Sequence, residues 1–264
     1  MYINITESEK IPAQRLADLI LDIGTYLLAS GAHSGRLNSN IGRLAATWEF
    51  EVNISPTFKG LLVTVKDLND PSNSVTRFKN SPPHNVHLAV LTDISHLSWK
   101  VQEERLSITE VERAFAHIKT KPCYKDIYVA IAVGFSCAGL CLFSLGDTMN
   151  AIVAFAAAFL GYMVRVVLTK KSFNPMICIS IAAFVTTLIT GLGSLYEIGS
   201  HPEAAMATAV LYLIPGVPLI NCVIDLIEGY LSSAINRALF GGFILLCIAA
   251  GMTLCITLMG ISNF

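Results

Sequence analysis

Residues Ile214 to Arg237 read IPGVPLINCVIDLIEGYLSSAINR, and this stretch decides how the rest of the chain is interpreted. It overlaps an uncharged apolar run, residues 204–224, that is long enough to span a membrane. Pro215, Gly216 and Pro218 interrupt the run, and each proline removes a backbone donor and crowds the preceding helical turn. The sequence therefore predicts a broken membrane helix, whose freed backbone groups must be buried in protein or line a wet cavity.

Polar side chains follow the predicted break at helical spacing. They stand at i, i+4, i+7 and i+11, which are positions Asn221, Asp225, Glu228 and Ser232. On a continuous helix, this spacing places all four on one face. A broken helix that leads into an acidic face is typical of the midplane sites of secondary transporters. The sequence therefore predicts a substrate or proton pathway here.

Asp225 is the strongest candidate, because a carboxylate inside a membrane must be paired, protonated or hydrated and can carry a proton. The alternative is a solvated carboxylate at the cytoplasmic end of the span. Glu228 can share a proton or a cation with Asp225, or can be a solvated carboxylate at the membrane interface. Asn221 can bind a substrate amine or carboxylate, or can form a hydrogen bond between helices.

Two further charged residues are weaker candidates for the pathway. Arg237 can hold a substrate carboxylate, although a positively charged anchor on the cytoplasmic side explains it more easily. Asp147 stands in a short predicted turn, where it can gate or receive protons, or simply be solvated. The seven cysteines form no CxxC pair or Cys/His cluster, and six of them lie in apolar segments. We therefore expect neither a metal nor a cofactor.

The composition separates a water-facing half from a membrane half. The chain has 264 residues, of which 53% are hydrophobic, and its mean hydropathy is +0.60, which excludes an ordinary soluble domain. Only four of the 18 lysines and arginines and six of the 19 acidic residues lie after residue 125. We therefore expect a cytoplasmic domain at 1–125 and a membrane domain at 126–264. The net charge of −1 and the absence of a basic block disfavour a nucleic-acid partner.

The first 125 residues show a change of period from helix to strand and back. Helical spacing covers 12–30 and 34–48, period-two segments cover 51–55, 60–66 and 74–78, and helical spacing returns at 87–105. Ser107 and Glu110 then form a capping-box pattern that opens a further helix. This order predicts a small α+β domain with about three strands. Ser34 with a neighbouring histidine, and Asp93 with His96, lack any nucleophile-elbow motif that would support hydrolysis.

The second half predicts an α-helical polytopic membrane protein with about five transmembrane helices. The expected spans are 127–146, 148–168, 172–197, 203–224 and 238–262. Lysines and arginines precede the first span, separate the second from the third, and stand at Arg237 between the fourth and fifth. By the positive-inside rule, the N-terminal domain is cytoplasmic and the C-terminus is outside. We expect a multi-pass protein of the plasma (inner) membrane, in contact with the lipid bilayer.

Two stretches carry a resemblance to a known family. PGVPLIN, followed by Asp225, Gly229 and Arg237, resembles the pattern P-G-x-P-x-x-N-x-x-x-D-x-x-x-G of the threonine/serine exporter family. GAHSGR at 31–36 is similar to the opening of such chains, whereas Glu228 is not part of the pattern. The resemblance implies a secondary transporter that exports a threonine/serine-like amino acid or a dicarboxylate such as succinate, with proton coupling through its intramembrane acid.

The resemblance also implies partners. Single-chain exporters of this family carry a second membrane unit, whereas this sequence ends at Phe264, after its fifth predicted span. It resembles the longer subunit of two-chain exporters, so we expect a small polytopic membrane partner and a possible homo-oligomer. The alternative function is a membrane-anchored cytoplasmic enzyme or sensor. A bare anchor would not need Pro-Gly-x-Pro and a polar face within one span.

Overall fold

The structure, a computed structural model, describes residues 11–57, 59–83 and 85–261. His84 and residue 262 of the expected fifth span lie outside the described residues. The chain forms two compact units. The first comprises Met1–Pro122 with Val217–Ala238, and the second comprises Cys123–Gly216 with Leu239–Phe264. The structure thus groups Val217–Ala238 with the first unit, although the sequence pattern assigns this segment to the membrane domain.

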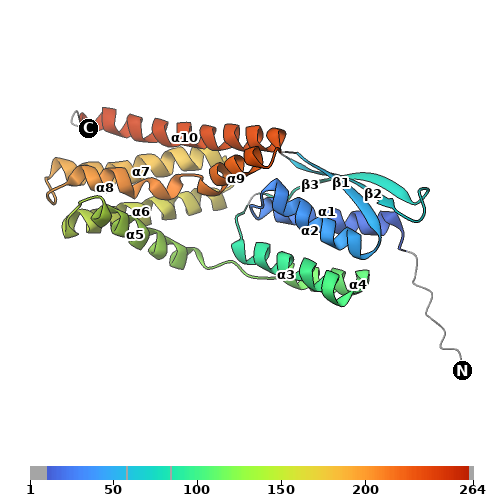
Figure 1. The fold of residues 1–264 in the computed structure, drawn as a ribbon. Helices are drawn as coiled ribbons and strands as arrows, with labels where there is room; N and C mark the ends of the chain where they lie inside the picture. Colours follow the sequence, from blue (N-terminus) through green and yellow to red (C-terminus); the bar gives the residue numbers. More distant parts are fainter. Residues whose placement is uncertain (1–10, 58, 84, 262–264) are drawn as a thin grey trace, which may run out of the picture. The chain divides into compact units, whose positions relative to one another are not determined.

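The first unit contains a sheet of β-strands (Figure 1). The sheet is antiparallel and three-stranded, in the order β1-β2-β3. Its strands are β1 (Phe50–Pro56), β2 (Gly60–Asp67) and β3 (Ser74–Asn80). Alternate residues of β2, Leu61, Val63 and Val65, are fully buried, as a sheet with one face on a core requires. The three strands expected from the period-two segments are confirmed.

Four helices of the first unit provide the rest of its core. They are α1 (Ala13–Ala29), α2 (Ser34–Thr47), α3 (Leu88–Glu104) and α4 (Ile108–Lys119). Helix α1 contacts β2 and β3, α2 contacts β1 and α3, and α3 contacts α4. The capping box of Ser107 and Glu110 is present at the start of α4, as expected. The apolar face of α1, including Leu16, Ile20 and Ile23, is completely buried.

Asp22 on α1 gives the first unit a dependence on pH. It forms ion pairs with Lys79 on β3 and with Lys119 on α4. Burial acts to raise the pKa of Asp22, but the two ammonium groups outweigh it and hold the pKa below its ordinary value. The stabilisation is therefore complete above the ordinary value of about 3.9 and is lost as the pH falls through the lowered one.

We expect Asp22→Asn to lower the stability of the chain at pH 7 by at most about 1 kcal/mol, because the pair is partly exposed. The variant should also lose less stability than the wild type on acidification. Thermal unfolding of the full chain between pH 7 and pH 3 measures both effects. Asp18→Asn is the matched control, since Asp18 is more exposed and pairs with Arg77 alone among the described residues. Equal acid sensitivity of Asp22→Asn and wild type would contradict the assignment.

The second unit is a set of apolar helices. It contains α5 (Asp126–Phe143), α6 (Thr148–Lys170), α7 (Pro175–Leu195), α8 (Pro202–Ala209), η1 (Leu211–Leu213) and the part of α10 (Leu231–Met259) after Ala238. Small residues allow close approach: a Cβ on Gly251 of α10 would lie 2.2 Å from the Ser180 carbonyl oxygen of α7. Large apolar side chains such as Phe135, Leu142 and Leu246 are exposed, as lipid contact requires.

Four of these helices, α5, α6, α7 and α10, are long and apolar enough to cross a membrane. The pair Pro202–Leu213 and Gly216–Ile227 also passes this test when taken together, either as one broken span or as a re-entrant loop. The described residues therefore contain four candidate spans, or five if the pair counts as one. This is the architecture of a polytopic membrane protein with a small α+β part.

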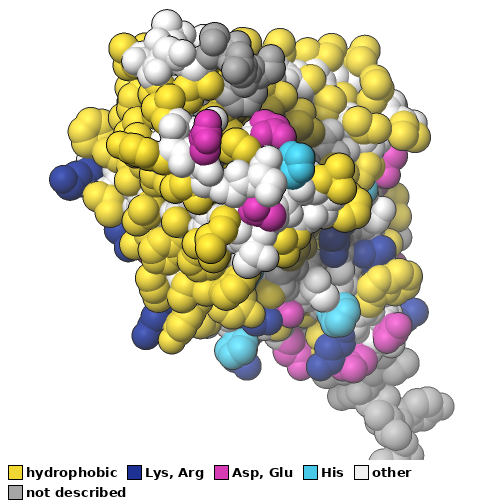
Figure 2. Space-filling view, turned by 90° about the vertical axis from the view of Figure 1, so that its left-hand side faces the viewer, with side chains coloured by type: hydrophobic (Ala, Val, Ile, Leu, Met, Phe, Trp, Pro, Cys, Tyr) yellow, Lys and Arg dark blue, Asp and Glu magenta, His cyan; other side chains and the backbone are white. Residues whose placement is uncertain are grey.

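Charge is distributed unequally between the two ends of the second unit. Lys170, at the end of α6, pairs with Asp126 at the start of α5. At the opposite end of these helices, Asp147 begins α6 and binds Ser200 from the segment between α7 and α8. Figure 2 looks onto a surface where acidic side chains and a histidine are surrounded by hydrophobic ones. This asymmetry is the basis of the orientation expected from the sequence.

Candidate functional site

Helix α9 (Gly216–Ile227) carries two of the expected site residues and ends earlier than the sequence pattern indicates. Gly229 adopts a φ of +85°, and the Tyr230 N–H donates to the Asp225 carbonyl at 2.7 Å, which is a Schellman-type helix end. The next helix, α10, begins at Leu231. The prediction of one continuous helical face from Asn221 to Ser232 is therefore wrong for Ser232, because the helix ends before Gly229 and Ser232 belongs to α10.

The position of Arg237 is a second correction. The sequence pattern places it in a loop before a span at 238–262, but α10 begins at Leu231 and Arg237 lies inside this helix. The residues from Leu231 onward have no helix breaker, so the helix extends seven residues further toward its N-terminus than the apolar run alone suggests. Arg237 is thus a helical residue of the first unit, and its contact residues, Ala32 and Asp225, belong to the same unit.

The break itself lies between η1, which ends at Leu213, and α9, which begins at Gly216. Pro215 precedes the helix directly, and Pro218 is its third residue, where a missing N–H removes no intrahelical hydrogen bond. A Cβ on Gly216 would meet no atom within 4 Å. These three residues shape the start of α9 and offer no side-chain chemistry.

The tight turn of residues 31–34, which joins α1 to α2, is the other half of the site. Gly31 has a φ of +98°, a conformation that favours glycine, and the Ala32 N–H donates to the Leu27 carbonyl. His33 is the N-cap of α2, and Ser34 is its first residue. The turn thus presents two carbonyl oxygens followed by the free N–H groups of a helix N-terminus.

Each of three motif side chains binds one backbone group of this turn. Asn221 Nδ2 donates to the Gly31 carbonyl at 2.7 Å, and Arg237 Nη2 donates to the Ala32 carbonyl at 2.7 Å. Asp225 Oδ1 accepts the Ser34 N–H at 2.7 Å. The positively polarised end of α2 also favours a carboxylate at this place. The site is therefore a clamp in which α9 and α10 hold the 31–34 turn.

Asp225 and Arg237 form a buried ion pair. The Asp225 side chain is 0% exposed and that of Arg237 is 19% exposed, with Nε 2.9 Å from Oδ2. The N–H is not aligned with Oδ2, which has no hydrogen-bond donor, so the contact is ionic only. Ser34 Oγ is likewise buried without a hydrogen-bond partner. Both atoms are buried polar groups that other contacts of the described residues leave without a hydrogen bond.

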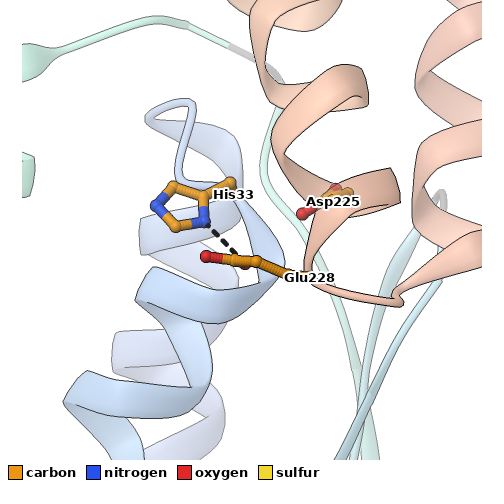
Figure 3. A group of neighbouring side chains, drawn as sticks. All are labelled: His33, Asp225 and Glu228. Carbon is orange, nitrogen blue, oxygen red and sulfur yellow. Dashed lines mark hydrogen bonds and ion pairs between the residues drawn. The ribbon is translucent and has the colours of Figure 1, made fainter.

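His33 and Glu228 lie beside this pair (Figure 3). His33 Nδ1 is 3.2 Å from Glu228 Oε2 and also accepts the Arg36 N–H at 3.3 Å. One nitrogen cannot donate to the carboxylate and accept from the amide at once, so the two contacts require different tautomers of the imidazole. Glu228 also lies against Gly35, where an added Cβ would be 2.0 Å from its Oε2. A side chain at position 35 would displace the carboxylate.

Three of these side chains also form a group of potential metal ligands. His33, Asp225 and Glu228 each offer one ligand atom, and these atoms lie within 4.8 Å of one another. A divalent cation there would be placed beside the Arg237 guanidinium and the positive end of α2. These positive charges already compensate the Asp225 carboxylate and would oppose a divalent cation beside it.

Asp147 lies elsewhere, in the second unit, and is not brought together with the other candidates. Its Oδ1 accepts the Asn150 N–H at 2.8 Å, and its Oδ2 accepts the Ser200 N–H at 2.8 Å. These backbone hydrogen bonds hold the pKa of Asp147 below its ordinary value. In this structure the carboxylate begins α6 and fixes the segment before α8.

The hydrolytic alternative finds little support in the geometry of the described residues. Ser34 Oγ has no hydrogen-bond partner, and the His33 ring nitrogen faces Glu228 and the Arg36 amide. Asp93 pairs with Lys121 at 2.6 Å. A serine nucleophile needs a base within hydrogen-bond distance, so these residues do not form a catalytic set.

Sequence reasoning missed the contribution of the 31–34 turn. His33, the histidine beside Ser34, caps α2 and also contacts Glu228. The available signal was that GAHSGR and PGVP…N…D…G…R both carry the family resemblance. Two motifs of one family that lie almost 200 residues apart are good candidates for a shared site.

The apolar helices, the helix break and the buried carboxylate–arginine pair are features of a polytopic membrane protein with a polar site. The chain belongs to the putative threonine/serine exporter family, whose model matches residues 18–259. It is 29% identical over 262 residues to the probable succinate transporter subunit YjjP of Klebsiella aerogenes, covering 98% of this chain and 99% of the relative. It is also 29% identical over 250 residues to the probable succinate transporter subunit YjjP of Escherichia coli K12, covering 93% and 95%. No solved structure matches the chain.

Proposed function

We infer that this chain is the larger subunit of a secondary transporter that exports a small hydrophilic dicarboxylate, with succinate as the first candidate, in exchange for protons. A threonine/serine-like amino acid is the second candidate, because the family description names these amino acids. The observation that carries the proposal is the buried Asp225–Arg237 pair at the helix break. The names of the two relatives support the choice of a dicarboxylate.

Protonation of Asp225 provides the coupling in this proposal. An ionised Asp225 attracts Arg237 and accepts the Ser34 N–H, which keeps α9 and α10 on the 31–34 turn. A protonated Asp225 no longer attracts the guanidinium, which is then available to a substrate carboxylate. The clamp thus has two states that differ in charge, and the proton and the anion each favour one of them. Asn221 and Glu228 hold the turn in place during this exchange.

The membrane arrangement and the partner are part of the same proposal. The first unit faces the cytoplasm and the chain lies in the plasma (inner) membrane, since lysines gather at one end of α6 and acidic groups at the other. A small polytopic membrane protein supplies the other half of the pathway, because the relatives are named as subunits. The exposed apolar side chains of α10, among them Leu239, Phe243 and Leu254, offer one surface for it.

We expect cells that make this chain together with its small membrane partner to export succinate faster than cells with either subunit alone. The rate should rise as the external pH falls, because protons enter in exchange for the substrate. Efflux of labelled succinate and labelled threonine, at several external pH values and equal protein levels, is the measurement. Export of neither compound above background, or export that is indifferent to pH, would contradict the proposal.

A further inference from the structure

An open, solvent-facing cavity of about 740 Å³ lies in the first unit, and the clamp residues His33 and Glu228 form part of its wall. Its wall is formed by α2, α3 and the segment that joins α9 to α10. The side chains that matter here are Arg36, Asn38, Arg43, Ser95, Trp99 and Tyr230. A volume of this size is within the range of small-molecule sites in proteins.

Two arginines on α2 give the cavity a positive wall. Arg36 donates from Nε and Nη2 to Ser95 Oγ at 3.3 and 3.2 Å. Arg43 donates in the same way to Ser98 Oγ at 3.1 and 3.0 Å. Neither guanidinium forms an ion pair with a carboxylate, and neither Nη1 has a hydrogen-bond partner, among the residues that the structure describes. Each arginine therefore retains donors and an uncompensated charge for a ligand.

The spacing of the two guanidinium groups follows from the serines that hold them. Ser95 and Ser98 are three residues apart on α3, so their Cβ atoms are separated by about 5–6 Å. The two arginines are thus anchored about one helical turn apart along α3. An anion with two acid groups at a similar separation can meet both, whereas a monocarboxylate can meet only one.

Both arginines are held in place before any ligand arrives. The Arg43 guanidinium lies 4.4 Å from the centre of the Trp99 ring, and its Nη2 also donates to Asn40 Oδ1 at 2.8 Å. Arg36 Nη2 donates to the Leu91 carbonyl at 3.3 Å. Across the cavity, the Tyr230 hydroxyl accepts from Asn38 Nδ2 at 2.9 Å and keeps its own proton for an acceptor. Such preorganised donors reduce the ordering cost of binding.

We propose that this cavity binds a small organic dianion, such as a four-carbon dicarboxylate, between Arg36 and Arg43. The proposal rests on the proposed function in one respect, since it makes the cavity the water-facing place where the exported anion first binds. Glu228 lines the cavity and also lies beside Asp225, so the bound anion would be next to the group that carries the proton. A zwitterionic amino acid fits less well, because its ammonium group would face an arginine.

Tryptophan fluorescence offers a direct binding assay on the full chain purified in detergent. The chain has two tryptophans, of which Trp99 lines the cavity and Trp48 donates to the Leu106 carbonyl elsewhere. In a Trp48→Phe background, the signal therefore reports on the cavity alone. We expect succinate to change it with saturation at pH 7, and butyrate, threonine and inorganic phosphate to do so at least about ten-fold more weakly.

Arg36→Gln and Arg43→Gln should each raise the Kd for succinate by about ten-fold or more, because each removes one charge-assisted contact. Lys100→Gln is the matched control, since it removes one positive charge from α3 outside the cavity and should leave Kd unchanged. Circular dichroism establishes that the variants are folded. Arg36→Lys keeps the charge but loses the planar guanidinium with its paired N–H donors, so its Kd should lie between those of wild type and Arg36→Gln. Each arginine also links α2 to α3, so the Gln variants could weaken binding by disturbing this packing. Comparison with Arg36→Lys, which keeps the charge, separates the loss of ligand contacts from the loss of packing.

Absence of saturable succinate binding, or equal binding by the Gln variants, would overturn this proposal. So would binding of butyrate or phosphate as tight as that of succinate, since the two-acid requirement would then be wrong. The result is separable from the proposed coupling. Asp225→Asn should keep succinate binding in this assay, and intact binding in a chain whose export ignores pH would contradict the coupling alone.

Discussion

Succinate export by Asp225→Asn should fall by about ten-fold or more and should no longer depend on external pH. Asparagine keeps the volume of the side chain and an oxygen that can accept the Ser34 N–H, so the 31–34 turn stays bound. The amide cannot be ionised, so it neither takes up a proton nor attracts Arg237. A ten-fold fall in rate corresponds to about 1.4 kcal/mol, which is no more than a contact to a charged group contributes.

The experiment compares efflux against external pH in cells with equal amounts of each variant in the membrane. Asp93→Asn is the matched control, because it makes the same acid-to-amide change at a surface ion pair with Lys121 and should export like wild type. Glu228→Gln should be milder than Asp225→Asn, because Glu228 is partly exposed and contacts His33 rather than Arg237. If the Asp225→Asn variant exports at the wild-type rate and with the wild-type dependence on pH, Asp225 is not part of the proton pathway.

The local pattern of the chain predicts most of its elements. Helical spacing at 12–30 and 34–48 corresponds to α1 and α2, and the three period-two segments correspond to β1, β2 and β3. These elements are predictable because burial of one face requires a fixed period along the sequence. The apolar spans are predictable for a related reason, since an uncharged run of about 20 residues has few alternatives to a membrane helix.

The site is less predictable, because it depends on contacts between distant segments. The pattern identifies Asn221, Asp225 and Arg237, but it cannot show that their partners are backbone groups of Gly31, Ala32 and Ser34. The pattern also extends α9 through Gly229, because the spacing of polar and apolar residues does not reveal that one residue has a positive φ. A glycine four residues after Asp225 is compatible with a continuing helix and with a helix end, and tertiary contacts decide between them.

Arg237→Gln should destabilise the chain by about 3–5 kcal/mol, more than Asp225→Asn does. The asymmetry follows from exposure. Removal of the arginine leaves a carboxylate that is 0% exposed without a counter-charge, whereas removal of the carboxylate leaves a guanidinium that is 19% exposed and can reach water. The variant also loses the hydrogen bond to the Ala32 carbonyl. Thermal unfolding of the purified chain in detergent measures the difference.

The double variant Asp225→Asn with Arg237→Gln separates the charge from the contact. If the loss in Arg237→Gln comes from an uncompensated carboxylate, the double variant should regain most of the stability, because neither buried charge remains. Acidification should likewise reduce the loss in Arg237→Gln, since a protonated Asp225 needs no counter-charge. Arg237→Lys keeps the charge and should be intermediate, because an ammonium cannot reach both Asp225 and Ala32 with the geometry of the fork. If the double variant is as unstable as Arg237→Gln, then the contact with the 31–34 turn, and not the ion pair, holds α10 in place.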